Sequence, residues 1–526
     1  MPACLAAGVL LLYSIDLGRA PIYLHPAEVL FALQAHAIAT TAHDLGGRLL
    51  PVYFHMAPIG ENVWFQPVIE YFTAPFFWVL PITEWAVRIP SVIVGAIDVV
   101  LAYFVALRLF GEVRWAVVPA VLLALTPSHF IHSRVAMDYL YPVPFVLAWL
   151  LLLLRYLDER RTLTLWIATT ILGVGVYSYI ASAIMMPVYL ALTWLMLFVG
   201  GERRVRTYVI AASGFWPVVI GLAWIARHPG ILDQTLSRYQ TEHAIAAYDA
   251  AGRLSMSAMM EELRRPVHFF DVTGRVSLYW YFFDPSYLFL TGGYANIMDS
   301  TRRVGVFLAP LIVFVPAGIA YLAGGVRERG RMLLLLGLLT APLAAVLVVP
   351  EPYAVDRELE LLPFAVLIGA FGVRALMRAS NVWLRRAAVA LMVAVPLHFA
   401  FLCYDYWRDY PLRAAYWFGG NNRAALEMII DREPPGHASP IYFDRERLPY
   451  IDAYWRFYVL KKHREDLLTA PASLRAGNAG GAPAPAGSLW LARADDTKTI
   501  DQRSSWRRVA VFPEPGSDPL FALFER

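Results

Sequence analysis

The chain has 526 residues, of which 58% are hydrophobic and only 16% are charged, and its mean hydropathy is +0.51. A soluble protein of this length needs more charge to cover its surface, so the composition argues against a soluble enzyme and indicates a polytopic membrane protein. The formal net charge is only +4 and the sequence has no basic run typical of nucleic-acid binding, so we expect no nucleic-acid partner.

Candidate membrane spans come first in chain order. A bilayer core takes about 20 mostly apolar helical residues to cross. Eleven runs meet this description, near 3–18, 88–110, 115–132, 139–155, 163–180, 182–199, 208–226, 304–323, 332–349, 359–376 and 387–404. The first run has no basic segment before it and no cleavage site after it, which predicts a short transmembrane helix rather than a cleaved signal.

Arginine placement predicts the orientation of the spans. Short loops that are rich in arginine stay on the cytoplasmic side of a membrane. The arginine clusters lie in five short loops on one side of the proposed topology, at 108–114, 155–161, 203–206, 327–331 and 374–386. The opposite side then receives residues 19–87, residues 227–303 and the tail. We therefore expect an integral, multi-pass protein of the plasma (inner) membrane with its active site on the extracytoplasmic side.

The outer segments have their own predicted structure. Two apolar stretches interrupted by Pro and polar residues, 25–43 and 64–81, are typical of helices that lie along the membrane surface. In the tail, 422–433 and 448–462 predict helices, 477–487 predicts a flexible linker, and short strands are expected at 440–444, 488–493, 507–512 and 520–525. The predicted domains are 1–404, transmembrane and all-α, and 405–526, a small extracytoplasmic α/β domain.

Five motifs occur in a fixed order along the outer loops. They are HPAEVLFALQAHAIATTAHDLGGRLLPVYF at 25–54, WAVRIPSVIVG at 85–95, TPSHFIHSRVAMD at 126–138, YFFDPSYLFLTGG at 281–293 and AVDRELELLPFAVLI at 354–368. Together they resemble the C-type glycosyltransferase fold, in particular the protein-mannosyltransferase and aminoarabinose-transferase superfamily. The apolar runs predict about 11 transmembrane helices, and the resemblance implies an enzyme that takes a sugar from a polyprenyl-phosphate lipid donor. The implied acceptor is extracytoplasmic: a lipid, a polysaccharide or a protein.

Such chemistry needs a carboxylate base for the acceptor hydroxyl and a cation for the phosphate leaving group. In the first outer loop the candidate bases are Glu28 and Asp44. The resembled family has an acidic pair where this chain has Ala27 and Glu28, so only one member of that pair is present. For Asp44, a turn residue before Gly46 and Gly47 is the structural alternative.

Two further outer motifs supply candidates. Asp138 follows Arg134 by four residues, so the two can share a helix face, with Asp138 orienting the acceptor or assisting the base and Arg134 reaching the donor phosphate or fixing Asp138. An ordinary surface ion pair is the alternative. Arg357 lies in the last small outer loop, where the resemblance implies a phosphate-binding basic residue, and its alternative is an ion pair with Asp356, Glu358 or Glu360.

Aromatic and histidine side chains complete the candidate substrate-binding set. Tyr177 and Tyr179 lie near the outer end of a span, where an aromatic belt is the alternative. His55 lies in the first outer loop with His25 and His43. Three histidines with Glu28 and Asp44 leave a divalent cation open, although no metal-binding motif is present and no cofactor is assigned.

A transporter or lipid flippase is the alternative function. It predicts internal repeats, matched broken helices and charges along a midplane path. The sequence shows no repeat, and Asp98 is the one acidic residue in the middle of a predicted span. That residue is the main feature that the transferase hypothesis leaves unexplained.

Overall fold

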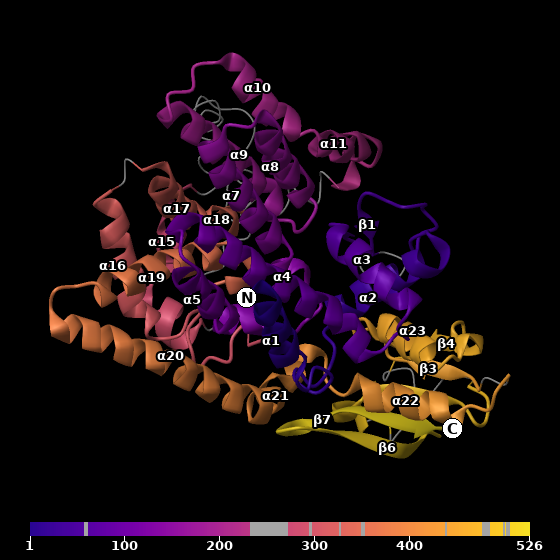
Figure 1. The fold of residues 1–526 in the computed structure, drawn as a ribbon. Helices are drawn as coiled ribbons and strands as arrows, with labels where there is room; N and C mark the ends of the chain where they lie inside the picture. The colour runs from indigo at the N-terminus through magenta and orange to yellow at the C-terminus, as the bar shows by residue number, and fades with distance from the viewer. Residues whose placement is uncertain are drawn as a thin grey trace, which may run out of the picture.

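The computed structural model describes residues 1–56, 62–231, 272–293, 297–325, 328–348, 353–436, 439–475, 484–497, 500 and 505–526. Apolar helices make up a bundle, and a small mixed sheet with its own helices lies at one end of it (Figure 1). The bundle helices are α1 (Pro2–Ser14), α4 (Glu84–Phe110), α5 (Val113–Ala124), α6 (Pro127–His132), α7 (Pro142–Glu159), α8 (Thr162–Gly175), α9 (Ser182–Val199), α10 (Val205–Gly214), α11 (Pro217–Arg227), α15 (Val272–Tyr281), α16 (Leu311–Ala323), α17 (Arg329–Thr340), α18 (Leu343–Val348), α19 (Leu361–Met377) and α20 (Val382–Arg408).

Each of the eleven predicted spans overlaps an apolar helix or a pair of consecutive helices. Five helical segments in the described part of the chain are long and apolar enough to cross a membrane, and a sixth span is formed if α10 and α11, bent by 53°, are counted as one. Five shorter apolar helices account for the other predicted runs. The chain is therefore a multi-pass membrane protein, and the count of eleven crossings stays a prediction.

Proline explains where two of the predicted spans are broken. A proline lacks the N–H that would continue the helical hydrogen bonds, so it tends to start a helix rather than extend one. Pro127 begins α6 after α5 has ended, which divides the run 115–132. Pro217 begins α11 after α10, which produces the bend in the run 208–226.

The first outer loop forms the two helices that were expected there. The first is α2 (Pro26–Thr41), and the second segment forms α3 (Val68–Thr73) followed by the 3-10 helix η2 (Ala74–Trp78). Between them a short hairpin pairs β1 (Phe54–His55) with β2 (Trp64–Phe65). At the start of α2 the His25 side chain accepts from Ala27 N and the Glu28 carboxylate accepts from His25 N, which forms a capping box.

The C-terminal segment contains a five-stranded mixed sheet in the order β4-β3-β5-β7-β6. Its strands are β3 (Ile441–Phe443), β4 (Pro471–Ser473), β5 (Leu489–Arg493), β6 (Arg507–Glu514) and β7 (Ser517–Glu525). The predicted strands match β3, β5, β6 and β7, whereas β4 was not predicted. The predicted helices match α22 (Asn422–Arg432) and α23 (Ile451–Lys461). Most of the predicted linker 477–487 lies outside the described residues.

The C-terminal segment packs against the first outer loop through α23, which lies beside α2 (Figure 1). The Tyr454 hydroxyl donates a buried hydrogen bond of 2.7 Å to the Leu24 carbonyl. Lys461 Nζ lies 2.7 Å from Glu84 Oε1, which joins the same helix to the start of α4. These contacts bring together residues that are 430 and 377 positions apart in the sequence.

Asp98 is fully buried in α4 and has a partner in the bundle. One carboxylate oxygen lies 3.3 Å from His129 Nε2, and the other ring nitrogen of His129 lies 2.9 Å from the Tyr13 hydroxyl. The three side chains join α4, α6 and α1 inside the apolar core. This network accounts structurally for the acidic residue that the sequence left unexplained.

Candidate active site

A cavity of about 300 Å³ opens where the first outer loop, three other outer turns and the C-terminal segment meet. That volume is at the lower end of the range for small-molecule sites, roughly 300–1,000 Å³. The residues that line it are His25, Pro26, Ala27, Leu30, Phe31, Trp64, Phe65, Gln66, Met137, Asp138, Tyr139, Tyr179, Ile180, Asp356, Arg357 and Tyr450. Asp138, Tyr179 and Arg357, predicted from three separate parts of the chain, therefore line one cavity.

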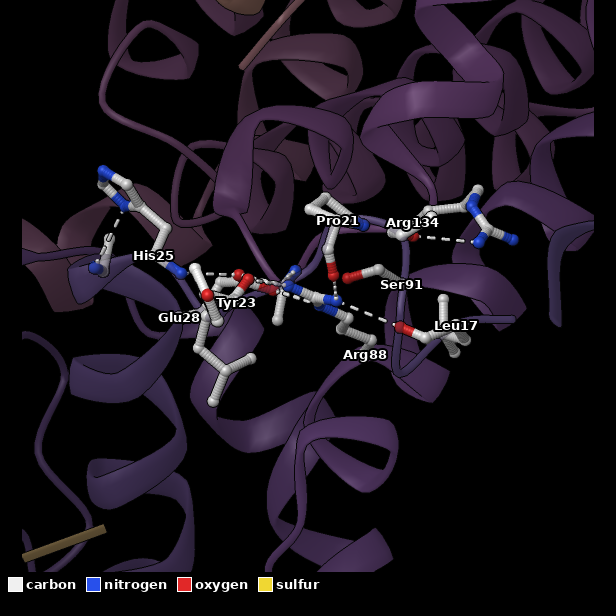
Figure 2. Close-up of polar contacts among 12 residues, drawn as sticks. Leu17, Pro21, Tyr23, His25, Glu28, Arg88, Ser91 and Arg134 are labelled. Carbon is white, nitrogen blue, oxygen red and sulfur yellow. Dashed lines mark hydrogen bonds and ion pairs between the residues drawn. The ribbon is translucent and has the colours of Figure 1, made fainter. Parts of the chain in front are cut away.

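Glu28 fixes the first turn of α2 beside this cavity (Figure 2). Its carboxylate accepts from Arg88 Nε at 2.9 Å and from the Arg88 terminal nitrogen at 3.0 Å. Two backbone groups, His25 N and Ala136 N, also donate to it, each at 2.9 Å. Burial alone would raise the pKa of Glu28, but Arg88 and these backbone donors outweigh that effect and lower the pKa. The carboxylate has no exposed surface, so the geometry favours a positioning role over that of a base.

Backbone carbonyl oxygens accept the remaining hydrogen bonds of the Arg88 guanidinium. It donates to the carbonyl oxygens of Leu17, Pro21 and Tyr23 at 3.0, 2.8 and 2.6 Å (Figure 2). The pair with Glu28 therefore holds α4, α2 and the segment before α2 together. Because Glu28 also binds Ala136 N, the same pair holds the backbone two residues before Asp138.

Arg134 holds the start of the turn that leads to Asp138. Its guanidinium donates to the carbonyl oxygens of Tyr13 and Ala20, and it lies 5.2 Å from the ring centres of Phe130 and Tyr406. The side chain is fully buried and is not among the residues that line the cavity. These contacts do not support the predicted reach to a donor phosphate, and they suit a role in holding the turn that leads to Asp138.

Asp138 begins the 3-10 helix η3 (Asp138–Leu140), which lies against η5 (Val355–Arg357). It is only 3% exposed and lines the cavity together with Tyr139. The rings of Tyr139 and Tyr179 meet edge to face with their centres 5.4 Å apart. The turn after α8 thus brings Tyr179 to the same wall, and the carboxylate of Asp138 lies among aromatic rings.

Arg357 supplies the positive charge. It is the sole arginine or lysine among the described residues that line the cavity, and its Nε lies 3.5 Å from Asp356 Oδ2. The ion pair with Asp356, which was one of the alternatives for Arg357, is therefore present. A guanidinium presents a planar set of N–H donors that suits two oxygens of a phosphate group.

Besides Glu28 and Arg134, three more of the predicted site residues lie outside the lining of the cavity. Asp44 accepts from Arg48 N at 2.8 Å and from Arg48 Nε at 2.7 Å, within the turn that was its structural alternative. The Tyr177 hydroxyl donates to Pro217 O at 2.6 Å and accepts from Gly221 N at 2.7 Å. His55 stacks on Trp64, with ring centres 4.5 Å apart, in the short hairpin. Their predicted functional roles gain no support from these contacts.

The histidines of the first outer loop have separate local partners. The His25 side chain caps α2, one ring nitrogen of His43 lies 2.7 Å from Thr41 O, and one of His55 lies 2.8 Å from Asn62 Oδ1. Within the described ranges, no three His, Cys, Asp or Glu side chains are grouped as a metal site. The contacts of these side chains therefore do not bring them together around an ion.

Several residues of this region were not predicted from the sequence. Asp356, Tyr139 and Tyr450 line the cavity, and of these only Asp356 was named, as a partner for Arg357. Ala27 also lines it, so the position where the resembled family has an acidic residue presents a methyl group to the cavity. The position of Tyr450 depends on how the C-terminal segment packs, which no local pattern reveals.

Glu70 in α3 is a further buried carboxyl group near the cavity. It has no exposed surface, and neither of its side-chain oxygens has a hydrogen-bond partner among the described residues. Burial raises the pKa of Glu70 well above its ordinary value, and the charge of Asp138 raises it further. Its surroundings therefore favour the protonated form more than water does.

The fold and this site define a multi-pass membrane protein with a small cavity lined by rings, carboxylates and one guanidinium. Residues 66–226 match the family described as dolichyl-phosphate-mannose-protein mannosyltransferase. This match and the fold make the chain similar to the C-type glycosyltransferase superfamily. No curated protein matches the chain in sequence.

Solved structures show the same fold at low sequence identity. ArnT from Cupriavidus metallidurans bound to undecaprenyl phosphate is 12% identical, with a TM-score of 0.57 over 99% of this chain and 97% of that one. The apo state of the same protein is 11% identical over the same shares, also with a TM-score of 0.57. A weaker likeness is to the apo oligosaccharyltransferase of Archaeoglobus fulgidus, 12% identical, with a TM-score of 0.49 over 95% of this chain and 71% of that one.

Proposed function

We propose that this protein is a membrane glycosyltransferase that moves a sugar from a polyprenyl-phosphate donor to an extracytoplasmic acceptor. The observation that carries the proposal is the single cavity that gathers Asp138, Tyr179 and Arg357. The family match at residues 66–226 supports the reaction class, and the fold it shares with ArnT supports a polyprenyl-phosphate donor. The lipid chain of such a donor stays in the bilayer, which accounts for a site built on a membrane bundle.

The reaction is an inverting displacement at the anomeric carbon. Asp138 accepts the proton of the acceptor hydroxyl, and the acceptor oxygen forms a bond to the anomeric carbon as the bond to the phosphate oxygen breaks. The electron pair of that bond leaves with the polyprenyl phosphate, whose negative charge Arg357 balances. A single displacement leaves the opposite anomer. Glu28 and Arg134 act as positioning residues, because both hold the turn that carries Asp138.

The test is mass spectrometry of envelope lipids and glycans from a deletion strain that expresses wild type or a variant. We expect a sugar to be missing in the deletion strain and to return with wild type. Asp138→Asn restores little of it, since an amide cannot accept the proton, and proton transfer by a placed side chain contributes roughly 10²–10⁴ in rate.

The matched control is Asp44→Asn, which makes the same chemical change at a carboxylate outside the cavity. It is expected to restore most of the product. Full restoration by Asp138→Asn with loss in Asp44→Asn would reverse the assignment of the base. A deletion strain that lacks no sugar would contradict the proposed function itself.

A further inference from the structure

Tyr450 is the one described lining residue that comes from the C-terminal segment. It precedes α23, and the rest of the lining comes from the outer loops of the bundle. A donor attached to a membrane lipid reaches the cavity from the bundle, where Arg357 lies. The C-terminal segment supplies a different side of the cavity. We therefore expect an extracytoplasmic acceptor to arrive from that side.

The backbone at Tyr450 is in the left-handed region, with φ 60° and ψ 10°. This conformation is unfavourable for a bulky side chain and costs about 1 kcal/mol or more. Such conformations gather at functional sites, where the surrounding structure enforces them. Glycine would adopt this conformation at a lower cost than tyrosine. The turn alone therefore does not explain a tyrosine at position 450.

The surrounding structure does hold Tyr450 in place. Ala453 N and Tyr454 N both donate to its carbonyl oxygen, at 2.9 and 3.1 Å. Tyr454 and Lys461, one and three turns further along α23, bind Leu24 and Glu84 of the bundle. The wall that Tyr450 provides is therefore attached to the same part of the chain that leads into α2.

The charge and surface of the cavity limit what can bind opposite Arg357. At their formal charges Asp138 and Asp356 contribute −2 and Arg357 contributes +1, so the lining carries −1. His25 adds no positive charge near pH 7, because burial lowers its pKa to about 4. Once a donor phosphate binds Arg357, an acceptor that carries further negative charge is repelled. The other lining surface is largely aromatic, and the apolar face of a sugar ring packs well on an aromatic ring.

We propose that Tyr450 forms the acceptor wall of this cavity and that the acceptor it contacts is an uncharged saccharide. This inference rests on the proposed function. It assigns to the C-terminal segment a direct part in choosing the acceptor.

The first experiment identifies the acceptor in the deletion strain. Mass spectrometry of glycan and lipid fragments is expected to locate the missing sugar on a saccharide without phosphate, carboxylate or sulfate. A missing sugar that is instead found on a phosphorylated lipid or on a peptide overturns this inference and leaves the proposed function standing. If no sugar is missing, the proposed function fails first, so the two failures are distinguishable.

The second experiment tests Tyr450 directly, with the product measured in strains that express equal amounts of each protein. Tyr450→Ala and Tyr450→Gly are expected to lower the product about two- to tenfold, the range that the loss of one ring contact gives. The glycine variant keeps the left-handed backbone accessible, so it separates loss of the ring from misfolding. Tyr450→Phe retains most of the product.

The control is Tyr442→Ala, which removes a half-buried tyrosine of β3 that does not line the cavity. Binding of undecaprenyl phosphate to the full-length protein, measured by native mass spectrometry, stays within twofold in all the Tyr450 variants if the ring contacts the acceptor alone. Normal product in both the alanine and the glycine variant, or equal loss in Tyr442→Ala, overturns the assignment.

Discussion

Two fully buried glutamates of the first outer loop have opposite surroundings. Glu28, in α2, accepts from Arg88 and from two backbone N–H groups, whereas Glu70, in α3, has no hydrogen-bond partner in the described part of the chain. The pKa of Glu28 is lowered by its partners in spite of burial, and the pKa of Glu70 is raised by burial.

This comparison shows that the partner, and not the loop or the residue type, decides what a buried carboxyl group does. With its donors, Glu28 is a charged anchor that holds the turn before Asp138. Without donors, the pKa of Glu70 is raised, because an isolated charge in an apolar site is strongly unfavourable. The predictions below test this difference, beginning with the largest expected effect.

The largest effect is expected for Glu28→Gln, which leaves Arg88 buried without its anion. Breaking one side of a buried ion pair typically lowers the free energy of unfolding by about 3–5 kcal/mol. Thermal unfolding of the purified protein measures this loss. The double variant Glu28→Leu/Arg88→Met, which removes both charges, is the control and should be more stable than the single variant. Equal stability of Glu28→Gln and wild type would contradict the claim that the charged Glu28 carboxylate stabilises the fold.

The same ion pair predicts that the folded protein loses stability at acidic pH. A carboxylate whose pKa is lower in the folded state stabilises the protein above its unfolded pKa, and this stability is lost as the pH falls through the folded pKa. Wild type should therefore lose stability below about pH 4.3, the ordinary value for glutamate, and Glu28→Gln should lose less over the same interval. Unfolding temperatures measured at a series of pH values give this comparison.

A smaller loss is expected for Arg134→Leu. The carbonyl oxygens of Tyr13 and Ala20 lose their donor, and an unsatisfied buried polar group costs about 1–3 kcal/mol. The free energy of unfolding should fall by that amount. Because Arg134 does not line the cavity, binding of undecaprenyl phosphate to the folded variant should be close to wild type.

For Asp44→Asn we expect a loss of about 1 kcal/mol or less. Its partner Arg48 is 25% exposed, and ion pairs that solvent reaches contribute little. Thermal unfolding measures the change. A loss as large as that of Glu28→Gln would show that the turn at Asp44 contributes more to the stability of the protein than its contacts indicate.

The smallest effect at low pH is expected for Glu70→Gln, where a neutral amide replaces a carboxyl group that is already neutral. The change in unfolding free energy at pH 5 should be within about 1 kcal/mol. A carboxyl group with a raised folded pKa lowers the stability of wild type as the pH rises between its unfolded and folded pKa values. The stability of Glu70→Gln relative to wild type should therefore increase as the pH rises above about 4.3, the ordinary value for glutamate. A difference that does not depend on pH would mean that Glu70 is charged in the folded protein.

The apolar helices and most of the strands could be predicted because each depends on local pattern. Long hydrophobic runs located α4, α9 and α20, and short apolar runs located β5 and β7. The missed strand β4 is three residues long and begins with a proline, which is typical of a loop or an edge strand.

The site was predicted only in part, since its contacts join distant parts of the chain. Asp138 and Arg357 could be named because they lie in two of the motifs that carry the family resemblance, and Tyr179 because it lies near the end of a predicted span. The partner of Glu28 could not be predicted, because Arg88 lies 60 residues further along the chain, within α4. Tyr450 could not either, because its place in the cavity depends on how α23 packs against α2.

The central claim is that Arg357 is the phosphate-binding cation of this cavity, and native mass spectrometry of full-length protein with undecaprenyl phosphate tests it most directly. Arg357→Gln is expected to weaken binding by about tenfold or more, as loss of a charge-assisted hydrogen bond implies. Arg447→Gln, on the surface of the C-terminal segment, is expected to leave it unchanged. Wild-type binding by Arg357→Gln would contradict the account.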